Sequence, residues 1–272
     1  GQYDRIVGAF TNSRNYLLTR TTPPPTIGSF TSNNDQIVIQ GSGFSLNAGD
    51  NIVAVNGVPA VVTSSTNTQL VVNMPANAST GLITVSVNQQ LAISTQSILV
   101  TVSAFPYTES FEQGLGDWTQ SIEDDFNWSI NAGGTPSVST GPTNATDGSE
   151  YLYTEASGNN NPGKVTYLTS TYFDLSTLTT PKFSFSYHMF GGTMGTLTLE
   201  ISNDNGQNWT SLWTQTGDQG NNWNTETLDL ANYQGKTVQF RFVGTTGSSW
   251  QSDIAIDHIQ VNNTGAIQIA SV

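Results

Sequence analysis

The sequence predicts an all-β protein built from two consecutive β-sandwiches, the second of them a jelly roll. Short runs in which apolar residues occupy every second position recur along the chain, such as QIVIQGSGF from Gln36 and KFSFSYHMF from Lys182. That alternation places apolar side chains on one face of a strand. Thr, Val, Ile and aromatic residues dominate these runs, and Gly, Pro or Asn bounds them, as strands and turns require. The 272 residues suffice for two separate cores.

Charge and cysteine content limit the partners and the chemistry. Lys and Arg number 7 against 20 Asp and Glu, which gives a formal net charge of −13. A phosphate backbone would be repelled, so nucleic acid and anionic membrane surfaces are not expected partners. Cysteine is absent, which excludes thiol catalysis, cysteine-ligated zinc and disulfides. No apolar run approaches the roughly 20 residues that span a bilayer, so membrane insertion is not expected.

Composition also divides the chain. Residues 1–22 hold three of the seven basic residues and show no sustained period. A run of three prolines then stiffens the chain into an extended spacer, because each ring fixes φ and removes a hydrogen-bond donor. The expected parts are an N-terminal tail or end of a preceding domain at 1–22, the first sandwich at 23–104, the second at 105–262 and a C-terminal tail at 263–272.

The segment 23–104 has little charged chemistry: Asp35 and Asp50 are its only acids, and it lacks Lys and Arg. Its strand candidates are QIVIQGSGF, NIVAVNGVPA, QLVVNMP, LITVSV and SILVTVSA. In GSGF (Gly41 to Phe44), NGVPA (Asn56 to Ala60) and the strands QLVVNMPA and TGLITVSV, the segment resembles an IPT/TIG domain. The resemblance implies an immunoglobulin-like β-sandwich that serves as a spacer or interaction module. Some relatives bind DNA, but the missing basic residues argue against that role here.

The segment 105–262 holds 17 of the 20 acids and four of the bases. Its strand candidates are YLYTEA, VTYLTSTYFDL, KFSFSYHMF, GTLTLEIS, TSLWTQT, NTETLDL, TVQFRFVG and DIAIDHIQV. In the third of these, alternation puts Phe183, Phe185, Tyr187 and Met189 on one face and Ser184, Ser186 and His188 on the other. We therefore expect one face of this strand to be buried in the core and the other to be exposed to solvent. So many strands in about 155 residues predict a two-sheet jelly roll.

The same segment resembles a MAM domain, with the bacterial cleaved-adhesin type of jelly roll as a close relative. The residues that carry the resemblance are Phe111 and Glu112 before Trp118, Asp125 to Trp128, Tyr187 to Gly192, LDLANYQGKTVQFRF (Leu228 to Phe242) and AIDHI (Ala255 to Ile259). The four cysteines of the family are missing, and His258 replaces its second closing acid. The resemblance implies adhesion or recognition, and the missing cysteines favour a bacterial origin.

Acidic residues of this segment are candidates for a cation site. Ca²⁺ takes six to eight oxygen ligands in irregular geometry, so carboxylates from distant strands together with backbone carbonyls suit it. The first and last strands of a jelly roll commonly pair, which would bring Glu112 near Asp257. The resemblance implies a structural Ca²⁺ at about this place, and the predicted ligands are Glu112, Asp125, Asn127, Asp147 and Asp257, with Asp124 as a further candidate. Alternatively, these acids cap turns and accept backbone N–H groups.

The run SNDNGQNW, from Ser202 to Trp209, matches the S-x-D-x-G-x-x-W pattern of an Asp box, with Asn208 in place of the usual Thr. We expect Asp204 to accept backbone N–H bonds across the turn, Gly206 to supply a positive φ, and Trp209 to plug into the core. A calcium loop is the alternative, but the spaced acids and closing Glu of an EF-hand are missing.

Two tryptophans are predicted ligand contacts. Trp250 and Trp223 lie in Gly-rich polar stretches that indicate exposed loops, whereas Trp118, Trp128, Trp209 and Trp213 are expected to be core anchors. Jelly rolls frequently bind glycans by stacking aromatic rings on sugars, so these two rings are the candidate glycan contacts.

Catalytic patterns are missing from the sequence. It has two histidines, no H-E-x-x-H, no G-x-S-x-G and no phosphate-binding glycine loop. Pairs such as Glu109 with Glu112 or Asp124 with Asp125 could be imagined as glycosidase carboxylates, but so acidic a segment produces pairs by chance. We therefore expect a non-catalytic module.

The predicted function is binding of an extracellular glycan or protein by a secreted or surface-anchored bacterial protein. The alternative is an accessory C-terminal region of a secreted peptidase or glycoside hydrolase, with a catalytic domain upstream. A purely structural stalk or self-association module is the third possibility. The sequence does not identify the ligand or the oligomeric state.

Overall fold

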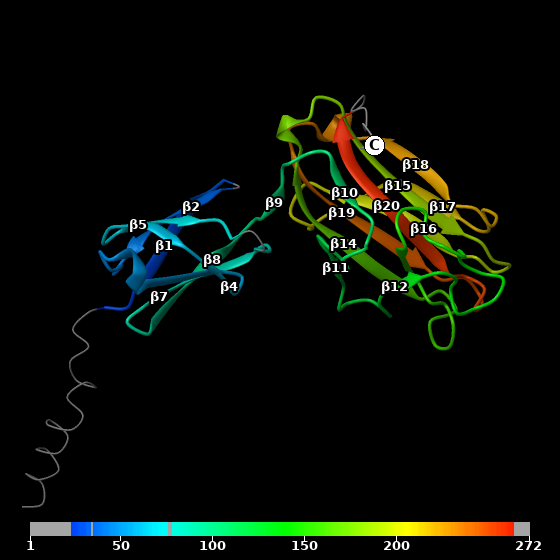
Figure 1. Ribbon diagram of the computed structural model, residues 1–272, viewed down its shortest axis with the longest axis horizontal. Coiled ribbons are helices and arrows are strands. Elements are labelled where there is room, and N and C mark those ends of the chain that lie inside the picture. The colour runs from blue at the N-terminus through cyan, green and yellow to red at the C-terminus, as the bar shows by residue number, and fades with distance from the viewer. Residues whose placement is uncertain (1–22, 34, 76–77, 264–272) are drawn as a thin grey trace, which may run out of the picture. The chain divides into compact units, whose positions relative to one another are not determined.

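The computed structural model describes residues 23–33, 35–75 and 78–263. Those residues form two compact units that divide between Val100 and Thr101 (Figure 1). Apart from three short 3-10 helices, η1 (Ala48–Asp50), η2 (Leu175–Thr177) and η3 (Ala231–Tyr233), their regular elements are strands. The all-β prediction is confirmed. The predicted tail at 1–22, and that at 263–272 beyond Asn263, lie outside the described residues.

The first unit is an immunoglobulin-like sandwich of two four-stranded sheets. One sheet runs β1 (Thr26–Ser32), β2 (Gln36–Ser42), β6 (Gln69–Asn73), β5 (Val62–Ser65), and the other runs β4 (Val58–Ala60), β3 (Asn51–Val55), β7 (Gly81–Val87), β8 (Gln90–Ile98). Alternate residues of the central strands bury their side chains between the sheets, as Ile37 and Ile39 of β2 and Val53 and Val55 of β3 do. Burial of these β-branched side chains is what holds the sheets together.

Strand β8 was not predicted from the sequence. The predicted strand began at Ser97, whereas β8 begins at Gln90 and ends at Ile98. Its pattern is inverted relative to hydrophobicity, because the small residues Ala92 and Ser94 are buried while Leu91 and Ile93 face outward. The alternation of apolar residues would therefore assign the wrong face of β8 to the core.

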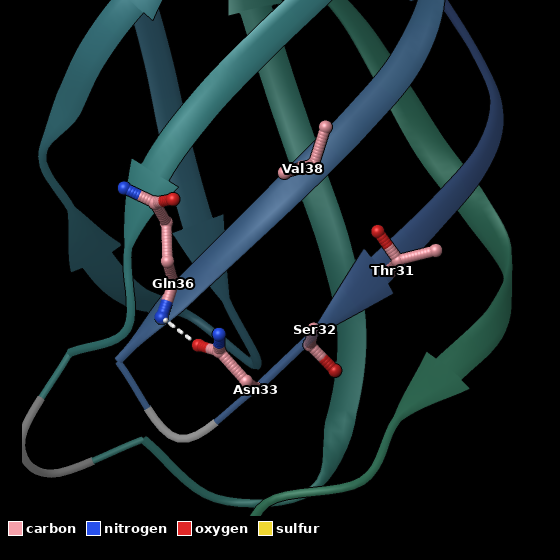
Figure 2. Close-up of a pocket in the computed structure, with 5 residues that line it drawn as sticks. All are labelled: Thr31, Ser32, Asn33, Gln36 and Val38. Atoms are coloured by element: carbon pink, nitrogen blue, oxygen red, sulfur yellow. Dashed lines mark hydrogen bonds between the residues drawn. The ribbon is translucent and has the colours of Figure 1, made fainter.

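The β1–β2 turn shows how local polar contacts set the hairpin of this unit (Figure 2). The Asn33 Oδ1 atom accepts the backbone N–H of Gln36 over 2.8 Å and that of Asp35 over 3.0 Å. An Asn side chain that takes backbone donors in this way closes a turn without further secondary structure. Thr31, Ser32 and Val38 line the pocket beside it.

The second unit is a jelly-roll sandwich. One sheet runs β12 (Ser129–Ala132), β13 (Glu150–Tyr153), β20 (Ile254–Asn263), β15 (Pro181–Met189), β18 (Asn224–Asp229), with β10 (Tyr107–Glu109) also paired to β20. The other runs β11 (Trp118–Gln120), β14 (Val165–Asp174), β19 (Thr237–Thr245), β16 (Thr196–Ser202), β17 (Thr210–Thr216), and β9 (Thr101–Val102) pairs with β14. Antiparallel pairing of β10 with β20 confirms that the first and last strands of the jelly roll lie side by side.

Aromatic rings fill the space between these two sheets. Phe183 and Phe185 of β15 are fully buried and contact Phe240 and Phe242 of β19 at centroid distances of 4.4 to 6.2 Å. The predicted core face of β15 is confirmed, since Tyr187 and Met189 are buried as well. This aromatic core fixes the sandwich and leaves the loops at its ends to carry polar groups.

In the described ranges, no helix has the length and hydropathy needed to cross a membrane.

Candidate functional site

Trp223 holds a distant segment of the chain on the outer face of the β13–β20–β15 sheet. Its indole Nε1 donates to the Asn144 carbonyl over 2.8 Å, and its ring lies 5.8 Å from the Tyr151 ring. Ala145 packs into the same small cluster. Trp223 lies in the loop before β18, as predicted, but its side chain is only partly exposed. Its ring is engaged by the protein itself.

His188 is buried under this cover. It is 1% exposed, its ring lies 5.6 Å from that of Trp223, and its Nε2 atom is 3.1 Å from Asn221 Oδ1. Burial lowers the pKa of His188, so the imidazole is uncharged at neutral pH. The prediction of a wet face is wrong for His188 and Ser186, because a segment distant in sequence covers the end of β15.

Glu112 binds the backbone at the start of β13. Its Oε1 atom accepts the N–H groups of Ser149 over 2.7 Å and Glu150 over 2.6 Å, and its Oε2 atom accepts the Ser149 hydroxyl over 2.9 Å. The Glu150 and Ser149 N–H donors hold the pKa of Glu112 below its ordinary value. Gly148 precedes these donors at φ +68°, where a Cβ atom would lie 2.5 Å from Glu112 Oε1. The carboxylate thus fixes the entry to β13.

Asp257 of β20 binds the same segment from the other side. It is fully buried, and its Oδ2 atom accepts the N–H groups of Thr146 and Asp147, each over 2.9 Å. Its Oδ1 atom accepts the N–H of His258 over 2.7 Å. Burial, with a smaller contribution from the Asp147 carboxylate, raises the pKa of Asp257 to about 6, against the lowering effect of its backbone N–H donors. The Asp147 carboxylate in turn contacts the His258 imidazole, with Oδ2 and Nδ1 2.7 Å apart.

The remaining predicted metal ligands bind elsewhere. Asp125 pairs with Lys164 over 3.0 Å and accepts the Val165 N–H over 2.8 Å, and Asp124 accepts the Tyr167 N–H over 2.7 Å. They attach the loop before β12 to the first residues of β14, in the opposite sheet. Asn127 is exposed beside them in that loop. The structure thus gathers Glu112, Asp147 and Asp257 around residues 146–150. Asp124 and Asp125 lie in a different place, in the loop before β12, and bind the backbone of β14.

The gathered carboxylates have the chemistry of a calcium site but lack a complete ligand set. Oxygen donors are the ones that Ca²⁺ prefers. Over residues 23–33, 35–75 and 78–263, no group of three or more His, Cys, Asp and Glu side chains is positioned to hold a metal ion. Backbone carbonyls or water would have to complete the coordination of an ion bound beside Asp147 and Asp257.

Trp250 is a large apolar side chain that stays accessible. It is 40% exposed in the loop between β19 and β20. Fully buried Ser252 braces this loop, since its Oγ atom accepts the N–H groups of Gly195 over 3.0 Å and Gly247 over 2.7 Å. The Thr193 hydroxyl also donates to the Gln251 carbonyl over 3.2 Å. A braced loop presents the indole with little ordering left to do on binding.

The Asp box forms as predicted, except at its tryptophan. Asp204 accepts the backbone and side-chain N–H groups of Asn208 over 2.9 and 2.6 Å, which with the Ser202 hydroxyl lower the pKa of Asp204 to about 2. Gly206 adopts φ +79°. The prediction that Trp209 enters the core is wrong. Its ring is half-buried and lies 4.2 Å from the guanidinium of Arg241.

Arg241 is a structural residue of the sheet surface that the sequence did not single out. Its guanidinium lies between the rings of Trp209 and Tyr167, 4.6 Å from the latter, and its Nε donates to Glu200 over 2.8 Å. The sequence does indicate that Arg241 faces outward, because side chains alternate along β19 and Arg241 lies between Phe240 and Phe242. Both faces of the guanidinium are covered by aromatic rings, and its Nε is hydrogen-bonded to Glu200. We therefore assign this stack to stabilisation of the sheet surface.

The fold and these contacts define a class: a two-module β-sandwich chain whose polar side chains brace its loops and strand ends. The family model of the MAM domain (meprin/A5/mu) matches residues 110–265, and that of the IPT/TIG domain matches residues 21–103. The chain therefore belongs to the MAM domain family, with an IPT/TIG domain ahead of its MAM domain.

Two curated relatives are similar to part of this chain. MAM domain-containing glycosylphosphatidylinositol anchor protein 2 of Mus musculus is 29% identical over 182 residues, which is 59% of this chain and 19% of that protein. Neuropilin-1a of Danio rerio is 31% identical over 149 residues, 50% of this chain and 15% of that protein. The chain thus spans less than a fifth of either relative. Both are vertebrate proteins and lend no support to the predicted bacterial origin.

Two solved structures illustrate the similarity in three dimensions. The K2 cleaved adhesin domain of Lys-gingipain superposes with a TM-score of 0.40 at 20% identity, covering 57% of this chain and 98% of that one. A xylan-binding domain of carbohydrate-binding module family 22 superposes with a TM-score of 0.40 at 16% identity, covering 59% and 96%.

Proposed function

We propose that this chain is a non-catalytic extracellular binding module that recognises a glycan or protein target with the loops at one end of its MAM domain. The observation that carries the proposal is Trp250, which is 40% exposed on a loop held by the Ser252 hydroxyl. An indole presented on a rigid loop offers a flat apolar surface without a large entropic cost. Glu112, Asp125 and Asp257 support the non-catalytic part, because their carboxylates bind backbone N–H groups.

A glycan array with the full chain tests this proposal. We expect retention of a subset of neutral glycans, a loss of about tenfold or more in affinity for Trp250→Ala, and partial retention for Trp250→Phe, which keeps a stacking ring. Ile122→Ala is the matched control, because Ile122 is 98% exposed but aliphatic. Equal binding by the wild type and Trp250→Ala would show that the Trp250 loop is not part of the binding site. Hydrolysis of peptide or glycoside substrates by the chain alone would overturn the non-catalytic assignment.

We also propose that a Ca²⁺ ion stabilises the MAM domain beside Asp147 and Asp257. Support comes from the burial of Asp257, whose pKa is raised to about 6 in the absence of a positive side chain among its hydrogen-bond partners. A divalent cation next to this carboxylate would favour its charged form and stabilise the native state by mass action. The Glu112 carboxylate, which binds the same segment, is the predicted third contributor.

A thermal melt checks the calcium proposal. Excess Ca²⁺ is expected to raise the melting temperature, and a chelator to lower it, in the wild type but not in Asp257→Asn. Asp35→Asn serves as a control, since Asp35 lies in the first unit and not in the MAM domain. Identical melts with calcium and with chelator would eliminate the metal.

A further inference from the structure

Asp253 is a buried carboxyl group that its surroundings satisfy only in part. It is fully buried just before β20, and its Oδ1 atom accepts the N–H of Ala156 over 2.9 Å. Its Oδ2 atom is also buried and has no hydrogen-bond partner among residues 23–33, 35–75 and 78–263. A buried carboxylate oxygen without a donor costs more free energy than a neutral carboxyl group in the same place. The position therefore favours the protonated form.

The titratable groups closest to Asp253 do not offset a negative charge there. Burial, with a smaller contribution from the Glu155 carboxylate, raises the pKa of Asp253 to about 6, against the lowering effects of the Ala156 N–H and the Thr135 hydroxyl. The titratable groups that face it from β13 are two phenols whose pKa is raised by burial, so that both are uncharged at neutral pH: Tyr151 and Tyr153.

The basic side chains of the second unit are engaged elsewhere. Each contacts a carboxylate or an aromatic ring: Lys164 pairs with Asp125, Lys182 with Asp229, Arg241 with Glu200 and His258 with Asp147, and Lys236 lies over the Tyr233 ring. His188 is buried, and burial lowers its pKa. Ionisation of Asp253 therefore adds a second negative charge near Glu155, and no cation of the described chain pairs with it.

The backbone of Asp253 connects two segments next to the Trp250 loop. Its N–H donates to the Thr140 hydroxyl oxygen over 2.9 Å. The following residue of that segment, Gly141, donates its N–H to the Phe190 carbonyl over 3.2 Å. Asp253 is thus linked to the loop between β15 and β16, which also contacts the loop of Trp250.

The carboxyl group of Asp253 makes the second connection. Ala156, which its Oδ1 atom holds, begins a loop that returns at Gly163. The Gly163 N–H donates to the Gly247 carbonyl over 3.2 Å, within the loop that carries Trp250. Water can reach the buried carboxyl group only if these segments move apart, so its hydration is coupled to opening of the loops.

We propose that Asp253 is a pH sensor for the loops 156–163, 190–195 and 246–252, which we call the Trp250 loops: they stay closed while its carboxyl group is protonated and open more often when it is ionised. Hydration in the open state stabilises the negative charge that the closed state leaves unpaired. Because these loops carry Trp250, the sensor regulates the surface on which the proposed function rests. Acidic conditions favour its ordered form.

The sign and size of the effect follow from proton linkage. The closed state keeps the proton up to about pH 6, whereas an open, hydrated Asp253 releases it near the ordinary Asp pKa of about 4. Because the closed state binds more protons between these values, opening becomes more favourable as pH rises through this window and levels off above it. Between about pH 5 and about pH 7.5 the open fraction is expected to increase about tenfold.

Hydrogen exchange with mass spectrometry on the full chain tests the proposal without a ligand. After correction for the pH dependence of chemical exchange, amides of the Trp250 loops in the wild type are expected to exchange about tenfold faster at about pH 7.5 than at about pH 5. Asp253→Asn, which cannot ionise, abolishes this difference. Asp35→Asn is the matched control and retains it, since Asp35 lies in the first unit.

A second variant keeps the test decisive if Asp253→Asn does not fold. Glu155→Gln keeps an acceptor for the Ser157 N–H, which Glu155 Oε1 binds over 2.9 Å, but removes the neighbouring negative charge. The rise in exchange then shifts to lower pH. Loops whose exchange does not change with pH in the wild type, an equal rise in Asp253→Asn, or an unshifted rise in Glu155→Gln would overturn the proposal. Failure to retain any glycan counts against the proposed function alone, because no ligand takes part here.

Discussion

At the scale of single residues, buried carboxylates determine how this protein responds to pH. Asp253 is fully buried, and its Oδ1 atom accepts the N–H of Ala156 over 2.9 Å. Burial raises the pKa of Asp253 to about 6, and the nearby Glu155 carboxylate acts in the same direction. The folded state therefore holds this proton at pH values where the unfolded chain, with its ordinary pKa, has released it.

The sign of the resulting pH dependence follows. Because the folded state binds more protons between the ordinary Asp pKa and about 6, the contribution of Asp253 to the free energy of unfolding falls as pH rises through that window. Asp253→Asn mimics the protonated form. We expect it to raise stability at pH 7 on the order of 1 kcal/mol and to have little effect below about pH 4. Urea denaturation of both proteins at the two pH values measures this, and a variant less stable than the wild type at pH 7 would show that the charge has a stabilising partner.

Sequence reasoning worked for residues whose surroundings are local and failed where a distant segment intervenes. Phe183 and Phe185 were predicted core residues and are buried, because their strand alone sets which way they point. His188 obeys the same alternation, yet it is buried on the opposite face, where it contacts Trp223 and Asn221. The same distinction holds for the acids. Asp204 binds Asn208 within its own turn, as predicted, whereas Asp257 binds the N–H of Asp147, which lies 110 residues away in the sequence.

At the scale of elements, Trp223 and Asp257 both anchor the segment that covers β13 and β20. Trp223→Ala would remove the indole hydrogen bond to Asn144 and the ring contacts with Tyr151 and His188. We expect a loss of about 2 kcal/mol or more, with faster hydrogen exchange in residues 143–147. Hydrogen exchange with mass spectrometry checks this, and Trp250→Ala, which removes an exposed indole, is the control. Unchanged exchange in residues 143–147 would mean that Asp257 alone fixes that segment.

Close backbone approach in the loops around Trp250 gives a second element-scale prediction. A Cβ atom on Gly195 would lie 1.9 Å from the Thr245 carbonyl oxygen, whereas one on Gly192 would meet only the end of the Gln251 side chain, at 3.3 Å. Gly195→Ala is therefore expected to cost about 2 kcal/mol or more, and Gly192→Ala less than about 1 kcal/mol. Chemical denaturation of the two variants tests the difference. Equal losses would show that the loop can move away from Gly195.

At the scale of the whole molecule, each unit has its own core. The buried apolar residues of the first unit lie between Ile37 and Ile98, and those of the second between Tyr107 and Val261. A protein with two separate cores is expected to unfold as two units. Fragments 23–100 and 101–263 should each fold when expressed alone, as judged by dispersed amide NMR spectra and cooperative melts. A second unit that stays unfolded without the first would contradict this expectation.

The sequence by itself determined the all-β class, most long strands and the two families, because strand alternation and turn residues act over a few positions. Only the tertiary structure decided which acids meet, that Trp223 is held while Trp250 stays accessible, and which segments Asp253 connects. Those facts depend on strand register and on contacts between residues about 100 positions apart. No local pattern encodes such distances, so the proposed binding surface could be located only from the fold.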